Sequence, residues 1–139
     1  MQNKITPGTL VSATEVALET RTHRFWLRPE GYLYCKIKEE AEINYTDAVA
    51  SIEAIAKITG NMALPVFCDA RQLKSASKEA REYYAGVEAQ KNLKAAAILI
   101  GSPLTKSVVN FFLLFNKPPY PIKMFTSEEE ALQWIKKSI

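Results

Sequence analysis

Two short apolar runs constrain the fold of this 139-residue chain more than any other feature. Residues 65–69, which end in Asp69, and residues 95–100 are otherwise apolar at successive positions rather than at alternate ones, a pattern typical of strands that are buried on both faces of a parallel sheet. Each run is followed by a segment in which apolar residues recur at helical spacing. Strands that alternate with helices build a mostly parallel sheet, so the sequence predicts an α/β fold.

The segment before these runs predicts a β-hairpin. Residues 24–28 and 32–38 are rich in aromatic and aliphatic side chains, and the second stretch alternates with a period of two. Residues 29–31, Pro-Glu-Gly, supply a short turn between them. The two strands are therefore expected to pair antiparallel, and a start near Ala17 would lengthen the first.

Four helices and a last strand complete the expected order ββαβαβαβα, with a polar lead-in at residues 1–20 and a single domain at residues 21–139. The first helix is expected to start at Asn44 or Thr46 and to end at Gly60. The other elements are predicted at residues 77–91, 103–116 and 121–125, and from a capping box that begins at Ser127.

Composition excludes several classes of function. The 18 Lys and Arg residues against 15 Asp and Glu give a net charge of +3, too small to imply a nucleic-acid or membrane partner. No apolar run approaches the ~20 residues of a membrane span, and we expect no secretory signal. One histidine and two cysteines are too few for a structural zinc site, so no metal or cofactor is expected. Cys35 and Cys68 are predicted to be buried free thiols of a cytoplasmic protein rather than a disulfide.

Three segments can be compared with a known fold. They are VFCDAR at residues 66–71, SKEAREYY at residues 77–84 and PIKMFTSEEEALQW at residues 121–134. Together with the order of elements, they resemble the SpoIIAA-like fold of STAS domains, which occur in anti-sigma-factor antagonists and sulphate transporters. The chain is similar to an uncharacterised bacterial branch of this group over residues 21–139. The resemblance implies a non-enzymatic regulatory module that binds a protein partner or a second copy of itself.

The candidate site follows the first buried strand and consists of Asp69, Arg71, Ser75, Ser77 and Arg81. Ligands of open α/β sheets bind beyond the carboxyl ends of the strands, and a helix start flanked by two arginines suits a phosphate or carboxylate. Alternatively, Ser75 or Ser77 only caps the helix while Asp69 pairs with Arg71 or Arg81.

The resemblance adds a phosphorylation hypothesis for the same segment. Anti-sigma-factor antagonists carry a phosphorylatable serine in an Asp-Ser-Ser/Ala-Gly-like motif at this place. Residues 75–80, Ser-Ala-Ser-Lys-Glu-Ala, supply serines without the preceding Asp and the following Gly. Asp69 matches the aspartate at the strand end. This segment would then be phospho-regulated at Ser75 or Ser77.

The helix at residues 103–116 is apolar on more than one side. A stripe expected to cover the sheet contains Leu104, Val108, Phe111, Phe112 and Phe115. Val109 and Leu113 fall outside this stripe, which predicts a dimer or partner interface around them. The alternative is that residues 1–20 cover them.

Two other functions stay open at this point. A small-molecule or lipid carrier, like the CRAL-TRIO proteins that STAS domains resemble in outline, would use a pocket lined by Tyr83, Tyr84, Phe111, Phe112 and Trp134. A hydrolase or phosphotransfer enzyme would use Asp69. No catalytic set accompanies it, because Cys68 is expected to point to a sheet face and His23 to solvent. Residues 128–130, three glutamates, are expected to stabilise a helix N-terminus rather than to bind a metal.

Overall fold

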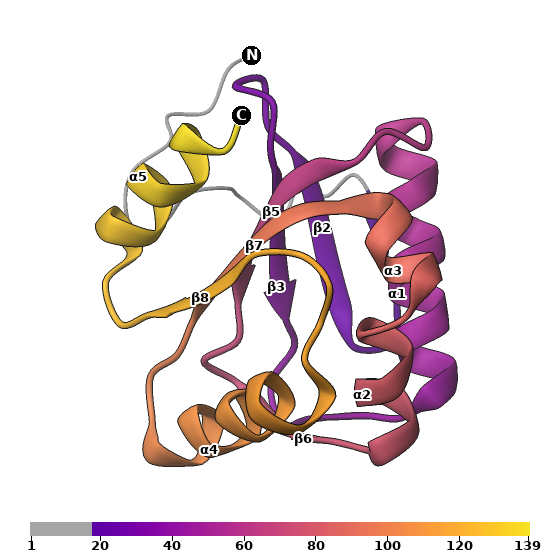
Figure 1. Ribbon diagram of the computed structural model, residues 1–139, viewed down its shortest axis with the longest axis vertical. Coiled ribbons are helices and arrows are strands. Elements are labelled where there is room, and N and C mark those ends of the chain that lie inside the picture. The colour runs from indigo at the N-terminus through magenta and orange to yellow at the C-terminus, as the bar shows by residue number, and fades with distance from the viewer. Residues whose placement is uncertain (1–17) are drawn as a thin grey trace.

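A six-stranded mixed sheet forms the centre of the structure, a computed structural model that describes residues 18–139 (Figure 1). Its spatial order is β1-β2-β3-β5-β7-β8. The first three strands pair antiparallel and the last four pair parallel, which confirms the predicted sheet. The strands are β1 (Leu18–Glu19), β2 (His23–Leu27), β3 (Leu33–Ile37), β5 (Leu64–Asp69), β7 (Leu93–Leu99) and β8 (Ile122–Phe125).

The predicted hairpin is formed by β2 and β3, with Phe25 opposite Cys35. Gly31 closes the turn at a φ of 104°, a backbone conformation that glycine adopts without a steric penalty. The expected long first strand does not form over the described residues. Ala17 and the rest of residues 1–17 lie outside them, and β1 reverses at residues 20–22 to pair with β2.

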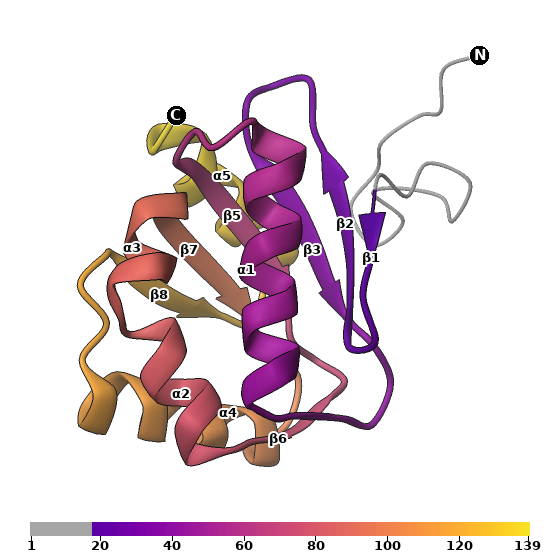
Figure 2. The same cartoon turned by 90° about the vertical axis from the view of Figure 1, so that its right-hand side faces the viewer.

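Helices cover the two faces of the sheet unequally. One face carries α1 (Tyr45–Thr59), α2 (Lys78–Tyr84) and α3 (Val87–Asn92), and the other carries α5 (Glu128–Lys137) (Figures 1 and 2). Asn44 and Asp47 form a capping box at the start of α1, and Gly60 ends this helix in the left-handed conformation. Both ends of α1 therefore lie where the sequence predicts them.

Two features of the α1 side of the sheet differ from the predictions. The single helix expected at residues 77–91 is two helices, because Gly86 adopts an extended backbone and becomes the N-cap of α3. The loop expected at residues 70–76 contains β6 (Leu73–Ala76), which pairs parallel with β4 (Ala41–Ile43) in a second, two-stranded sheet. Only a few residues take part in each strand, so neither leaves a legible alternation in the sequence.

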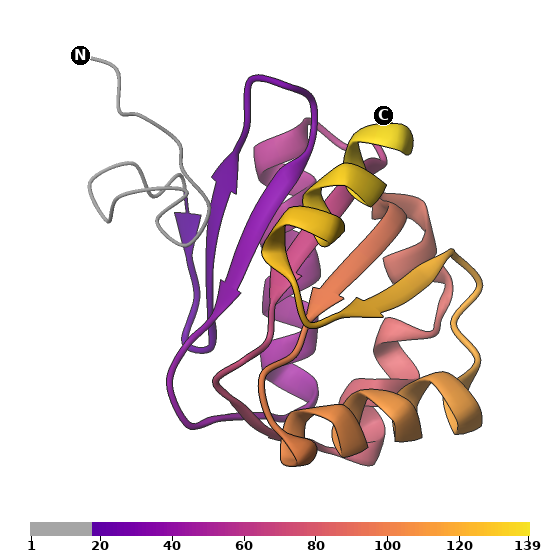
Figure 3. The same ribbon diagram turned by 90° about the vertical axis from the view of Figure 1, so that its left-hand side faces the viewer.

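Helix α4 (Pro103–Phe111) continues into the π-helix η2 (Phe112–Asn116). Figure 3 shows α4 below the sheet, past the arrowheads of the central strands, rather than flat against a face. The predicted sheet-facing stripe is therefore wrong for three of its five residues, while Val108 and Phe112 do face inward. Leu104, Phe111 and Phe115 are exposed, whereas Val109, predicted as an interface residue, is only 5% exposed. The narrow inner line of α4 consists of Thr105 and Val109, one helical turn apart.

Candidate functional site

Asp69, the last residue of β5, is the centre of a buried charge cluster. Its side chain is 1% exposed, and Arg71 donates three hydrogen bonds to it, from the backbone N at 3.1 Å, from Nε at 3.0 Å and from Nη2 at 2.8 Å. Lys36 Nζ lies 3.5 Å from the same carboxylate, and Arg71 Nη2 lies 3.7 Å from Glu128 at the start of α5. The partner of Asp69 is thus Arg71, while Arg81 takes no part.

Opposing effects act on the pKa of Asp69. Burial raises it, but the hydrogen bonds from Arg71 and the charge of Lys36 outweigh burial, so that the pKa lies below the ordinary aspartate value. The carboxylate stays ionised at neutral pH, and Arg71 occupies both of its oxygens. In this arrangement Asp69 braces the β5–β6 loop, because Arg71 is held to it by three hydrogen bonds.

The structure separates the five candidate residues into two groups on opposite sides of the sheet. Side chains alternate along a strand, so Asp69 points to the same side as Phe67. Phe67 packs in the hydrophobic cluster between the sheet and α5. Val66 and Cys68 point to the α1 side. Ser75, Ser77 and Arg81 belong to β6 and α2, which lie on the α1 side.

The second group, Ser75, Ser77 and Arg81, lies around the start of α2. Ser77 is the N-cap of α2, and its Oγ accepts a hydrogen bond from the Ala80 N–H at 3.1 Å. Ser75 is exposed on β6. Arg81 donates from Nη1 to the Ala76 carbonyl at 2.7 Å, and its guanidinium lies 4.5 Å from the centre of the Phe111 ring. Arg81 therefore joins α2 to α4.

Ser75 and Ser77 also line a polar hollow on the surface together with Arg21 and Lys38. Both cations already have acidic partners, because Arg21 pairs with Asp47 and Lys38 with Glu19. The hollow contains side chains of both signs and is not a dedicated anion site.

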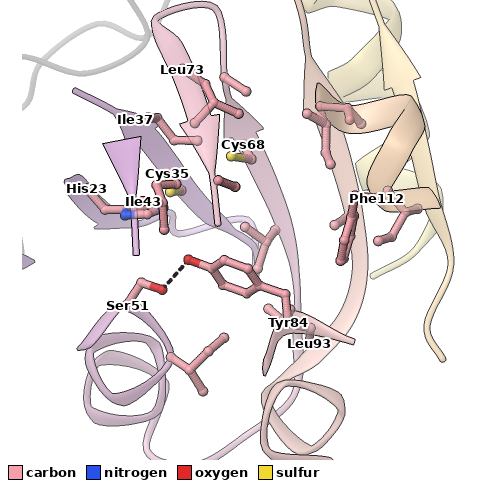
Figure 4. A pocket seen from close by; sticks show the side chains of 18 of the residues that line it. His23, Cys35, Ile37, Ile43, Ser51, Cys68, Leu73, Tyr84, Leu93 and Phe112 are labelled. Carbon is pink, nitrogen blue, oxygen red and sulfur yellow. Dashed lines mark hydrogen bonds between the residues drawn. The ribbon is translucent and has the colours of Figure 1, made fainter. Parts of the chain in front are cut away.

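An apolar cavity of about 140 Å³ lies between the sheet, α1, α2 and η2 (Figure 4). Cys35, Cys68 and His23 point into it from the strands, and Phe112 faces them from η2. On one wall the Ser51 and Tyr84 hydroxyls hydrogen bond to each other at 2.7 Å. Of the five aromatic residues expected to line a pocket, Tyr84 and Phe112 do so.

The other three expected pocket residues lie elsewhere. Trp134 packs against Phe125 on the α5 side, Tyr83 against Tyr45, and Phe111 against Phe115 on the outside of the helix. Aromatic spacing in the sequence indicates which residues share a helix face but not what that face meets. The aliphatic and thiol residues that supply most of the cavity wall carry no such signal.

The two thiols occupy paired positions in the wall of this cavity. Cys35 and Cys68 are opposite each other across β3 and β5, and both are free, as predicted. Burial, together with the hydrogen bond between Cys35 and Cys68, raises the pKa of the Cys35 thiol well above its ordinary value. A raised pKa keeps the thiol protonated and disfavours a role as nucleophile.

The prediction that His23 faces solvent is wrong. His23 is 5% exposed and stacks on Phe25, its neighbour on the same strand face, with ring centres 5.6 Å apart. Its Nδ1 lies 2.7 Å from Thr22 Oγ1. Burial lowers the pKa of His23 to about 4, so the ring is neutral in the folded protein near neutral pH.

The outer surface of α4 and η2 carries four large apolar side chains. Leu114 and Phe115 are 67% and 68% exposed, and Leu104 and Phe111 are about half exposed. Leu113, predicted as an interface residue together with Val109, is half-buried. The exposed apolar surface thus exists on the predicted helix, but different residues form it. We name this set, Leu104, Phe111, Leu114 and Phe115, the α4–η2 face.

Metal and membrane signals are absent from the part of the chain that the structure describes. Residues 18–139 contain no cluster of three or more His, Cys, Asp or Glu side chains arranged to hold a metal ion. Within the same range, no helix has the length and apolar character needed to span a bilayer. Glu128, Glu129 and Glu130 occupy the first turn of α5, where the Ser127 side chain caps the helix.

A sequence profile of one family matches residues 25–139. The chain belongs to the family described as "Domain of unknown function (DUF7793)". No match is found among curated proteins. The solved structures that resemble this DUF7793 domain include an uncharacterized protein of the DUF3478 family with a SpoIIAA-like fold from Shewanella loihica PV-4. That protein is 18% identical, with a TM-score of 0.57 over 86% of this chain and 99% of the other.

Two further similar structures are anti-sigma factor antagonists. The one from Mycobacterium paratuberculosis is 15% identical, with a TM-score of 0.59 over 83% of the DUF7793 chain and 93% of its own. The other, SpoIIAA in its unphosphorylated form, is 13% identical, with a TM-score of 0.52 over 82% and 97%. At these identities the likeness shows the fold, and it confirms the predicted SpoIIAA-like architecture.

A structural role of Asp69 predicts a specific loss of stability. Replacement of Asp69 by Asn leaves Arg71 and Lys36 without their buried counter-charge, and we expect the free energy of unfolding to fall by about 3 kcal/mol at pH 7. Because the pKa of Asp69 is lowered in the folded domain, its stabilisation is present above about pH 4 and is lost as the pH falls through that lowered pKa. The difference between the wild type and D69N, measured by urea unfolding, should therefore narrow at acidic pH.

The control for D69N is Glu42→Gln, which removes an exposed carboxylate and should leave stability within about 0.5 kcal/mol. Equal stability of D69N and wild type at pH 7 would contradict the bracing role.

The buried histidine predicts a second pH dependence at milder acidity. The folded domain takes up the His23 proton near pH 4, whereas the unfolded chain takes it up near pH 6.5. Acidification from pH 7.5 to 5 should therefore lower the free energy of unfolding by about 2 kcal/mol. His23 is the single histidine in the sequence, so H23Q should flatten the curve in this range. An unchanged slope in H23Q would show that another group titrates there.

Proposed function

We propose that this chain is a non-enzymatic regulatory module of the STAS type that binds a protein partner through the α4–η2 face. The observation that carries the proposal is the exposure of Leu104, Phe111, Leu114 and Phe115 on one short segment. Apolar side chains gathered on the surface mark interaction sites more often than singly scattered ones do. The description of two similar structures as anti-sigma factor antagonists supports a regulatory role.

The charges around the α4–η2 face favour a heterologous partner with an acidic rim. Residues 103–117 contain Lys106 and Lys117, both exposed, and no Asp or Glu. Arg81 adds a third cation beside Phe111. In a two-fold symmetric dimer built on this face the same basic patch would meet itself. A partner with an apolar centre and carboxylates around it would complement both properties.

The state of the titratable groups supports a role without catalysis. Arg71 occupies the carboxylate of Asp69, burial keeps His23 neutral, and Cys35 has a raised pKa. A general base needs reach to a substrate proton, and a nucleophile needs an activating neighbour. These three groups serve the packing of the domain instead.

Photocrosslinking in the cells that naturally encode the chain tests the proposed surface. A photoreactive amino acid in place of Leu114 should give a discrete adduct with a second protein, whereas the same group in place of exposed Lys136, on α5, should not. A second substitution, Phe115→Asp, in the variant with the photoreactive group at position 114 should reduce the yield of this adduct at least about tenfold, because burial of a carboxylate opposes apolar contact. The absence of an adduct, or the same adduct from both positions, would contradict the proposal. An adduct with the mass of two copies of the chain would contradict a heterologous partner and show that the chain associates with itself.

We further propose that phosphorylation at Ser75 or Ser77 weakens this binding. Ser75 is exposed, and Ser77 begins the helix whose Arg81 contacts Phe111. A phosphate adds nearly two negative charges, which would repel an acidic rim and compete for Arg81. Ser75→Asp and Ser77→Asp should each reduce the Leu114 adduct by about fivefold to tenfold.

Aspartate is a good N-cap, so Ser77→Asp leaves α2 capped, whereas Ser77→Ala should cost about 1 kcal/mol of stability without weakening the adduct. Phosphate missing from both serines in protein from its native cell, measured by mass spectrometry, would remove the regulatory step and leave the docking proposal intact.

A further inference from the structure

The cavity on the α1 side of the sheet is large enough for a small molecule. Its volume is about 140 Å³, and an apolar cavity of about 150 Å³ stays free of water and accepts a molecule such as benzene. Well-packed domains contain few voids larger than a water molecule. A partly open apolar cavity of this size is therefore a distinct feature of the structure.

The cavity lies where α/β sheets bind ligands. Cys68 and Ile98 belong to the central strands β5 and β7, yet both keep accessible surface, because α4 lies past the ends of the strands rather than over them. Phe112 closes this side from η2 (Figure 4). The opening between the strand ends and the following helix is the usual ligand position in open parallel sheets.

One polar group in the cavity wall lacks a hydrogen-bond acceptor. Arg81 lines the cavity, and its Nε is buried without a partner among the described residues. Nη1 is already bound to the Ala76 carbonyl, and the guanidinium face rests on Phe111. The edge of the Arg81 guanidinium that contains Nε therefore remains without an acceptor within residues 18–139. Such an edge can bind a carboxylate through two parallel hydrogen bonds. In contrast, the Ser51 and Tyr84 hydroxyls satisfy each other.

We infer that this cavity binds a small carboxylic acid, with a compact aromatic or short aliphatic body among Cys35, Cys68 and Phe112 and with its carboxylate at Arg81. The ligand is anionic because a buried guanidinium N–H favours a charged acceptor. The size of the cavity limits the apolar body to about one aromatic ring. This inference goes beyond the proposed partner binding and does not rest on it.

Titration of the full-length chain with benzoate, hexanoate and the neutral analogue benzyl alcohol tests the inference by chemical-shift changes in two-dimensional NMR. At least one carboxylate should bind with resonance shifts centred on the cavity residues, and benzyl alcohol should bind at least about tenfold more weakly. Arg81→Lys keeps the charge but removes the planar edge, and it should weaken carboxylate binding by a similar factor. Arg24→Lys, the same change away from the cavity, should leave it unaltered.

Cys68→Phe fills the cavity and should abolish binding. If this variant does not fold, alkylation of Cys68 in the wild type gives the same information, because a ligand in the cavity should slow the reaction of the Cys68 thiol several-fold.

Three results would overturn the inference. The first is that neither benzoate nor hexanoate binds at concentrations up to about 10 mM. The second is equal binding of benzoate and benzyl alcohol. The third is undiminished binding to R81K.

Discussion

The alternation of side chains along β5 is the constraint on which the rest of the structure depends. This strand is buried on both faces, so Val66 and Cys68 must serve the α1 side while Phe67 and Asp69 serve the α5 side. A single residue step therefore separates an apolar cavity wall from a buried charge cluster. Arg71 follows Asp69 to one side, and the chain then crosses to β6 and α2 on the other.

The position of α4 past the strand ends produces both surfaces to which we assign a function. A helix laid flat on the sheet would have covered Cys68 and Ile98 and buried its own aromatic residues. Instead, its inner line is narrow, Val108, Val109 and Phe112 line the cavity, and Phe111 and Phe115 remain outside. Arg81 touches both regions, because it lines the cavity and stacks on Phe111.

Local patterns in the sequence predicted the elements that have strong patterns of their own. The buried strands at residues 65–69 and 95–100, the hairpin and the stop at Gly60 are confirmed. Tertiary placement could not be predicted in the same way. Periodicity shows which residues of α4 share a side but not which side is covered, and neither the buried face of His23 nor the separation of Asp69 from Ser77 is visible without the neighbouring layers.

The π-helical turn at residues 112–116 has a consequence for how such a domain changes over evolutionary time. A π-helix closes its hydrogen bonds one residue later than an α-helix does, so this segment accommodates a residue that an α-helix would not. Loss of one residue here would let the segment close as an α-helix, with the flanking turns left close to their present positions. The η2 segment is thus a place where the chain can change in length by one residue while the rest of the fold keeps its register.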